Sequence, residues 1–202
     1  MWAELLVRAW IDGRISASDS NSSISEAVRH LAQTWRATAD PGAGAPWYLS
    51  AKAGRGAHST IIGVEFTHVG RLWQWKALAV GDTDMFVLTA DDVLVYAYPL
   101  SDPAAFTSSP FLVSTGGENA ALAPGQRLRR RGVLRSGDRL MVATDALAKC
   151  LLVAHQAGEP LWGDAAAAVR SRRGFADWVA SLREGGRLED DDTTLMLVRR
   201  GA

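Results

Sequence analysis

The chain has 202 residues, of which 48% are hydrophobic and 22% are charged. This length fits one domain with a full hydrophobic core better than two, and the composition excludes a disordered, fibrous or membrane protein. The 22 acidic side chains balance the 22 basic ones, so no net charge attracts nucleic acid. The short arginine cluster at Arg127, Arg129, Arg130 and Arg131 does not change that expectation.

Cysteine content and the apolar pattern give the expected compartment. The single cysteine, Cys150, has no internal partner for a disulfide, and no basic start with an apolar run and a small-residue cleavage site follows Met1. No apolar stretch approaches the roughly 20 residues that cross a bilayer. We expect a cytoplasmic protein that has no membrane anchor.

The first part of the chain has helical periodicity. Apolar residues at helical spacing between Trp2 and Trp10, followed by Gly13, predict a first helix. Apolar residues at i, i+3, i+4, i+7 and i+11 predict a second helix over 24–35. The Gly, Ala and Pro residues of 41–46 predict a loop that leads to a short segment around Trp47, where the helical part ends.

The pattern then changes to short β-branched and aromatic runs. They predict strands over 60–66, 72–80, 85–88 and 93–98, with turn residues between them. Because the connections are short, these strands are expected to form an antiparallel meander of four hairpin neighbours. Segment 99–124 is rich in Pro, Ser and Gly and predicts a long loop with a short helix near Phe106.

The last part of the chain mixes both patterns. A weaker signal predicts a strand over 128–134, which pairs with a clearer strand over 139–143 across the turn at 136–138. Asp145 is expected to cap an apolar helix that reaches Ala154. Further helices are predicted around 165–169 and 175–182, and a final strand over 194–198. With no internal repeat and no linker, residues 1–202 are expected to form a single α+β domain.

Three aspartates lie beside predicted strands, where a rigid scaffold can hold carboxylates precisely. They are Asp82, Asp145 and Asp191. Taken singly, each fits an ordinary turn or helix cap. However, Asp191 belongs to a run of three aspartates before an apolar strand, and such like charges repel one another unless a cation compensates. Hard oxygen ligands suit Mg²⁺ or Mn²⁺, and a pair of such ions could activate water for attack on a phosphate ester.

Four segments, in order, resemble the motifs of metal-dependent protein serine/threonine phosphatases of the 2C type. They read GAHSTIIGVEF, WKALAVGDTDMFVL, SGDRLMVATDALA and DDDTTLMLV. Weaker likenesses, at PWYLSAK, at Tyr98-Pro99-Leu100 and at FADWVASLREGGRL, point to a bacterial subgroup of that family. The resemblance spans most of the chain. Thr83 and Ala146 stand where the family pattern has Ser and Gly.

The resemblance implies a fold and a function. The expected fold is a layered α-β-β-α sandwich of antiparallel sheets. Asp145 and Asp191 would be ligands of a two-metal centre holding Mg²⁺ or Mn²⁺, and Asp82 would help Asp145 to hold an additional ion. No catalytic side chain is expected beyond these metal ligands. The substrate would be a phosphoserine or phosphothreonine protein, hydrolysed without a covalent enzyme intermediate.

One part of the family pattern is absent from these 202 residues. Family members begin with strands that lead to an Ala-Asp-Gly segment whose aspartate bridges both metals, and the only early Asp-Gly here, Asp12-Gly13, follows the first helix. The sequence therefore predicts an N-terminally truncated domain with an exposed sheet edge that could self-associate. The alternatives are a catalytically inactive binding or regulatory module and a gene fragment.

Overall fold

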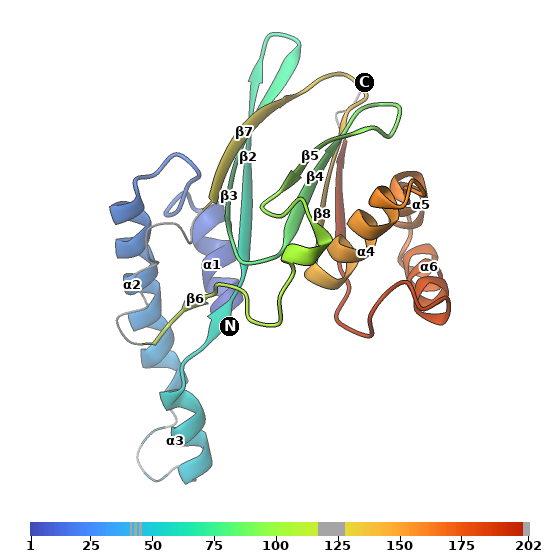
Figure 1. Ribbon diagram of the computed structural model, residues 1–202. Helices are drawn as coiled ribbons and strands as arrows, with labels where there is room; N and C mark the ends of the chain where they lie inside the picture. The colour runs from blue at the N-terminus through green and yellow to red at the C-terminus, as the bar shows by residue number, and fades with distance from the viewer. Residues whose placement is uncertain (41, 43, 45, 117–127, 200–202) are drawn as a thin grey trace. The chain divides into compact units, whose positions relative to one another are not determined.

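The computed structural model describes residues 1–40, 42, 44, 46–116 and 128–199 (Figure 1). Its helices are α1 (Trp2–Ile11), α2 (Asn21–Ala39), α3 (Trp47–Gly54), η1 (Pro103–Ala105), α4 (Asp145–Gln156), α5 (Trp162–Ala168) and α6 (Arg172–Glu184). Its strands are β1 (His58–Ser59), β2 (Ile61–Val69), β3 (Leu72–Val80), β4 (Asp84–Leu88), β5 (Leu94–Tyr98), β6 (Val113–Ser114), β7 (Leu128–Leu134), β8 (Arg139–Ala143) and β9 (Leu195–Arg199). The predicted α+β class with antiparallel sheets is confirmed.

The chain divides into two compact units. Unit 1 comprises Met1–Phe66, Lys76–Gly81 and Phe111–Arg131, and unit 2 comprises Thr67–Trp75, Asp82–Pro110 and Gly132–Ala202. The boundaries fall inside β2, β3 and β7, which form a three-stranded sheet in the order β2-β3-β7.

Unit 1 is built on its two long helices. The buried residues of α1 and α2 recur at helical spacing and share one apolar cluster with Leu78 and Val80 of β3. Helix α2 begins at the cap residue Ser20, whose side chain accepts a hydrogen bond from the Ser23 N–H. The prediction that the helical part ends near Trp47 is wrong, because α3 continues to Gly54. The loop predicted over 41–46 lies partly outside the described residues.

Unit 2 is built on a four-stranded antiparallel sheet in the order β5-β4-β8-β9. All five residues of β4 are buried, and α4, α5 and α6 share an apolar cluster with this sheet. Helix α4 is the most deeply buried helix of this unit, with Leu147 and Leu151 fully buried. Burial on both faces explains the near-continuous apolar runs of β4 and β8.

The predicted strands exist, but two predicted pairings are wrong. The four-stranded meander is absent, because β2 and β3 belong to one sheet and β4 and β5 to another. The chain leaves β3 at Gly81, whose φ of 104° permits a sharp change of direction. Similarly, β7 and β8 lie in different sheets rather than forming a pair. Short connections therefore did not decide these strand partners.

Other local predictions have mixed outcomes. The short helix predicted near Phe106 is the 3-10 turn η1, and the end of the long loop predicted over 99–124 lies outside the described residues. Asp145 is not the cap residue of α4 but its first residue, and Thr144 occupies the cap position. Within the described part of the chain, no helix is both long and apolar enough to cross a membrane.

Candidate metal centre

Strand register brings two of the predicted aspartates to the same end of the unit 2 sheet. Strand β4 begins at Asp84, which pairs with Ala143, the last residue of β8. Asp82 lies two residues before that pair on one strand, and Asp145 lies two residues after it on the other. Because antiparallel neighbours reverse direction, the start of β4 and the end of β8 meet at one sheet end.

These two carboxylates interact. Asp82 is buried, whereas Asp145 is partly exposed at the start of α4. Burial raises the pKa of Asp82, and the nearby charge of Asp145 raises it further, while a hydrogen bond to its own backbone acts in the opposite direction. Two carboxylates held together in this way repel each other, and a bound cation would offset that repulsion.

Thr144 connects this pair of strands to the segment that carries Asp191. Its hydroxyl oxygen donates to the carbonyl of Asp192 at 3.1 Å and accepts from the Thr194 N–H at 3.0 Å. Its own N–H donates to the Thr194 carbonyl at 3.2 Å. Since Ala143 pairs with Leu195 at the start of β9, the Asp191 segment arrives at the same sheet end. Thr144 therefore positions the segment, although it makes no side-chain cap for α4.

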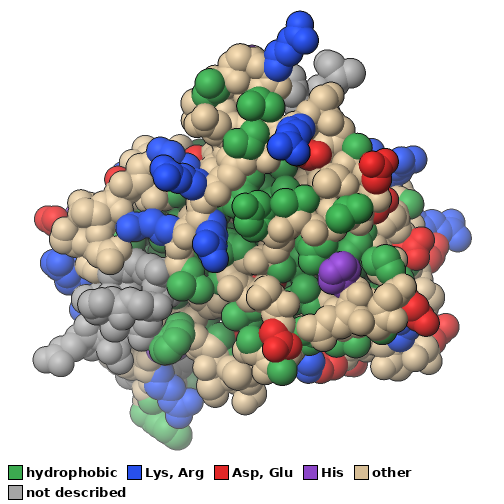
Figure 2. Space-filling model, turned by 45° about the horizontal axis from the view of Figure 1, so that its top comes forward, with side chains coloured by type: hydrophobic (Ala, Val, Ile, Leu, Met, Phe, Trp, Pro, Cys, Tyr) green, Lys and Arg blue, Asp and Glu red, His purple; other side chains and the backbone are tan. Residues whose placement is uncertain are grey.

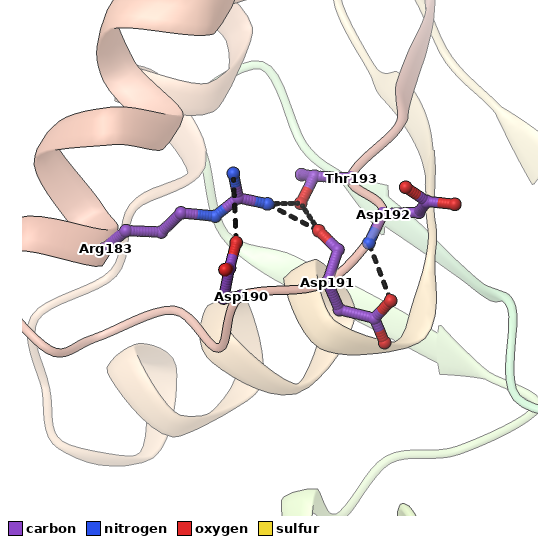
Figure 3. Close-up of polar contacts among 5 residues, drawn as sticks. All are labelled: Arg183, Asp190, Asp191, Asp192 and Thr193. Atoms are coloured by element: carbon purple, nitrogen blue, oxygen red, sulfur yellow. Dashed lines mark hydrogen bonds and ion pairs between the residues drawn. The ribbon is translucent and has the colours of Figure 1, made fainter.

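A turn held by Arg183 precedes β9 (Figure 3). The Arg183 guanidinium, on α6, donates to the Asp191 carbonyl and, at 3.2 Å, to the Thr193 hydroxyl. It also lies 3.7 Å from a carboxylate oxygen of Asp190, which is almost fully exposed. The carboxylate of Asp191 points away from Arg183 and accepts the Asp192 N–H at 2.7 Å. The arginine thus orders the backbone of the turn and leaves the Asp191 carboxylate exposed.

The donor chemistry fits a hard divalent cation. Mg²⁺ is commonly bound through one or two carboxylates, with water completing its shell, and Asp82 and Asp145 offer such a pair. Among the described residues, however, no group of three or more His, Cys, Asp or Glu side chains is close enough together to hold a metal. The structure therefore brings Asp82 and Asp145 together and places Asp191 on a segment at the same sheet end, without assembling a three-carboxylate cluster.

Sequence reasoning missed a fourth carboxyl group, Asp84. Its side chain is fully buried; Oδ1 accepts the Leu100 N–H at 2.9 Å, and Oδ2 has no partner among the described residues. Burial raises its pKa to about 8, with a smaller contribution from Asp82, against the lowering effect of the Leu100 hydrogen bond. An aspartate opening the apolar run of 85–88 was the available signal. The hydrogen bond ties the start of β4 to the segment after β5.

A hollow lies beside the Asp191 turn within unit 2. It has a volume of about 590 Å³. One wall is the apolar side of α6, including Phe175, Val179 and Ala180, and the other is formed by Asp191, Asp192 and Thr193. A segment of polypeptide could lie there with apolar contacts on one side and the exposed carboxylates on the other.

Comparisons with known proteins give matches only among solved structures. No protein-family model matches the chain, and no curated protein matches it. The catalytic domain of the serine/threonine protein phosphatase PstP, in complex with two manganese ions, is 16% identical over 97% of this chain and 79% of its own, with a TM-score of 0.48. The Mycobacterium tuberculosis serine/threonine phosphatase PstP/Ppp is 14% identical over 97% and 80%, with a TM-score of 0.46.

A third similar structure comes from Bacillus subtilis. The phosphatase domain of its cell fate determinant SpoIIE is 14% identical over 90% of this chain and 74% of its own, with a TM-score of 0.37. Sequence identity is low in every case. All three structures are described as phosphatases or phosphatase domains, the class that the ordered sequence motifs resemble.

Proposed function

We propose that this chain is a metal-dependent phosphatase-type domain that removes phosphate from phosphoserine or phosphothreonine in proteins. Asp82 and Asp145 would bind Mg²⁺ or Mn²⁺, and Asp191 would supply a further carboxylate. The observation that supports this most strongly is that Asp82 and Asp145 lie at one sheet end, just beyond the paired residues Asp84 and Ala143, where the charge of Asp145 raises the pKa of Asp82. Residues from the second and third phosphatase-like motifs, 63 positions apart, meet there, and the fourth motif reaches the same end through Thr144.

The roles of the residues follow from their positions. A bound divalent cation would supply positive charge for the phosphoryl oxygens and make water a better nucleophile. Asp82 and Asp145 would hold the cation, and the burial of Asp82 would exclude water from one side of the site. Thr144 and Arg183 would fix the approach of the Asp191 segment. The hollow beside α6 would accept the polypeptide around the phosphorylated side chain.

Manganese binding and hydrolysis test the proposal separately. Mn²⁺ binding is measured by titration calorimetry, and hydrolysis with an aryl phosphate and a phosphothreonine peptide. We expect Asp145→Asn and Asp82→Asn each to weaken Mn²⁺ binding by at least about ten-fold, because even residues outside the ligand shell change metal affinity by that order. Asp177→Asn is the matched control, since this exposed carboxylate on α6 pairs only loosely with Arg173 at 3.7 Å.

The outcomes separate the alternatives. Hydrolysis that needs Mn²⁺ and disappears in Asp145→Asn supports the phosphatase. Mn²⁺ binding that depends on Asp145 but gives no hydrolysis supports the inactive binding module instead. Mn²⁺ binding unchanged in both variants would show that these aspartates are not metal ligands.

A further inference from the structure

Unit 1 contains a strongly basic hollow that the phosphatase proposal does not use. Its volume is about 670 Å³. The residues that line it are Ala17, Ser18, Lys76, Arg129, Arg130 and Arg131, which we call the basic pocket. On the face that Figure 2 displays, Lys and Arg side chains lie at several separate places, and several of them lie in its upper left part. In a chain with no net charge, four cations around one hollow are a local concentration of positive charge.

Three separate chain segments build the basic pocket. The arginines belong to β7, an edge strand of the three-stranded sheet, and Lys76 belongs to β3 beside it. Alternation along a strand puts Arg129 and Arg131 on the same face. Ala17 and Ser18 come from the connection between α1 and α2. The hollow is therefore formed by tertiary structure rather than by a run of arginines alone.

Hydrogen bonds orient two of the cations without neutralising them. Lys76 Nζ donates to the Ser18 hydroxyl at 3.0 Å, and the Arg129 guanidinium donates to the backbone carbonyl of Asp19. Both partners are uncharged, so the full positive charge of each side chain remains. Each cation also retains donors for a ligand, because an ammonium has three and a guanidinium has five.

The nearby carboxylates are already engaged with the backbone. Asp19 accepts the Ser16 N–H at 2.8 Å, and Glu65 accepts the Ala17 N–H at 2.8 Å. Among the described residues, no carboxylate lines the basic pocket and none of its cations forms an ion pair. Lys76, Arg129 and Arg131 bring three positive charges together, and the charges of Asp19 and Glu65 offset them only in part, so an anion would relieve the remaining repulsion.

A simpler explanation is that the arginines only protect an edge strand from pairing with another chain. That role needs exposed charges on β7 and nothing else. It accounts neither for Lys76 on the neighbouring strand nor for the hollow that the α1–α2 connection completes. The convergence of three segments therefore favours a ligand.

We propose that the basic pocket binds a compact ligand that carries several linked phosphate groups. Guanidinium groups bind phosphate oxygens through paired hydrogen bonds, and the three cations Lys76, Arg129 and Arg131 match the charge of an oligophosphate better than that of one phosphate. The described residues that line the pocket include no aromatic side chain, so they offer no stacking surface for a nucleobase. This proposal is independent of the metal centre, whose residues all belong to unit 2.

Tripolyphosphate is the probe, with inorganic phosphate and ATP as comparison ligands. Binding to the full chain is measured by titration calorimetry in EDTA, which keeps divalent ions out of the measurement. We expect tripolyphosphate to bind and its affinity to fall when salt is added. Inorganic phosphate should bind at least about ten-fold more weakly. If ATP binds as tightly as tripolyphosphate, the phosphate chain of a nucleotide also fits the basic pocket, and the ligand could be a nucleotide.

Charge-removing variants test the residues. Arg131→Gln and Lys76→Gln should each weaken tripolyphosphate binding about ten-fold, the value of one charge-assisted hydrogen bond. Arg131→Lys should recover part of the loss. Arg29→Gln is the matched control, because this exposed arginine lies on α2 of the same unit and outside the pocket. Thermal unfolding of each variant checks that it is folded.

Three results would overturn the proposal. The first is that tripolyphosphate does not bind at millimolar concentration. The second is that Arg29→Gln weakens binding as much as Arg131→Gln. The third is that only a long polyanion such as single-stranded nucleic acid binds, which would assign the arginines to a diffuse basic surface.

Discussion

The carboxyl group of Asp84 differs from the other aspartates at the sheet end because nothing offsets the burial of its second oxygen. Oδ1 has the Leu100 N–H, but Oδ2 has no partner within the described ranges. A buried charge without a partner is costly, so the protonated form is favoured, which is why the pKa rises from 3.8 to about 8. In metal-free protein we therefore expect Asp84 to favour its protonated form and to link the start of β4 to the segment after β5 through the Leu100 hydrogen bond.

This assignment predicts a pH dependence of stability in metal-free protein. Asp84 has a higher pKa folded than unfolded, so its contribution is fully present below about pH 4 and is lost as the pH rises through about 8. Asp84→Asn keeps the acceptor for the Leu100 N–H and cannot ionise. We expect urea unfolding at pH 5 to 9, in EDTA, to show a smaller decline of stability with pH in the variant. Parallel pH profiles would contradict the assignment. Asp177→Asn serves as the exposed control.

Arg183 gives a second prediction at this scale, which rests on Asp191 being a metal ligand. Its guanidinium holds the backbone of the turn through the Asp191 carbonyl and the Thr193 hydroxyl. Arg183→Gln should loosen the turn and weaken Mn²⁺ binding by about ten-fold, as loss of a residue that orients a ligand does. Arg183→Lys should restore part of that affinity, because a lysine still donates to these acceptors.

Arg173→Gln is the control for that measurement, since Arg173 lies on the same helix and is 94% exposed. Equal Mn²⁺ affinity in Arg183→Gln and Arg173→Gln would remove the positioning role. The rate of hydrolysis alone is a poor readout here, because distortion of the hollow beside α6 would also lower that rate. Calorimetric metal affinity measures the positioning role directly.

At the scale of the elements, local patterns predicted the helices and strands better than their partners. Apolar periodicity located α1, α2 and each of the longer strands, because burial of one face is a local property of the sequence. Pairing is not local. The three residues between β3 and β4 have the length of a hairpin loop, yet the chain changes sheet there. Helix α3 was missed because its neighbours are Gly- and Pro-rich and its apolar pattern is short.

At the candidate site too, local sequence patterns located some residues and missed others. The motifs pointed to Asp82, Asp145 and Asp191, since each stands beside a strand. The residues that position them could not be found in this manner. Thr144 and Arg183 act through backbone carbonyls of a segment that lies 8 to 48 positions away in sequence. Such contacts depend on the register of β8 with β9 and on the placement of α6, which no single-sequence pattern encodes.

One packing contact between elements of unit 2 can be tested through a glycine. Gly132 of β7 lies against the buried indole of Trp75, and a Cβ atom added there would be 2.5 Å from a ring carbon. The indole also meets the ring of Tyr96 edge-on at 6.1 Å, which limits its movement. We expect Gly132→Ala to lower the free energy of unfolding by about 1–3 kcal/mol, the usual cost of overpacking.

Gly54→Ala is the control, because it lies in α3 with no atom within 4 Å of the added Cβ. It should leave stability unchanged or raise it by about 0.5–1 kcal/mol, since alanine favours helix. Chemical unfolding of both variants gives the comparison. A Gly132→Ala variant as stable as Gly54→Ala would mean that Trp75 is free to move aside.

At the scale of the whole molecule, the two units are interleaved along the chain. Each has its own apolar cluster, yet each is built from three separate stretches of sequence. Strands β2, β3 and β7 each contribute residues to both units. Neither unit can therefore lose its order without disrupting strands that continue into the other. This covalent arrangement favours cooperative unfolding, and with it the single domain that the length of the chain predicts.

Two matched core substitutions test that cooperativity. Leu6 is fully buried in the core of unit 1, and Leu147 is fully buried in the core of unit 2. Leu6→Ala and Leu147→Ala therefore each create a cavity in one of the two cores. Each should cost about 2–5 kcal/mol, and a shift of roughly 2–4 °C per kcal/mol is expected for a chain of this length. The controls Val7→Ala and Val153→Ala lie on the same two helices with half-exposed side chains and should shift the midpoint little.

If circular dichroism and tryptophan fluorescence follow one transition that moves in both core variants, the chain unfolds as one unit. If each variant moves a different transition, the two clusters are the cores of two domains, and the single-domain prediction is wrong.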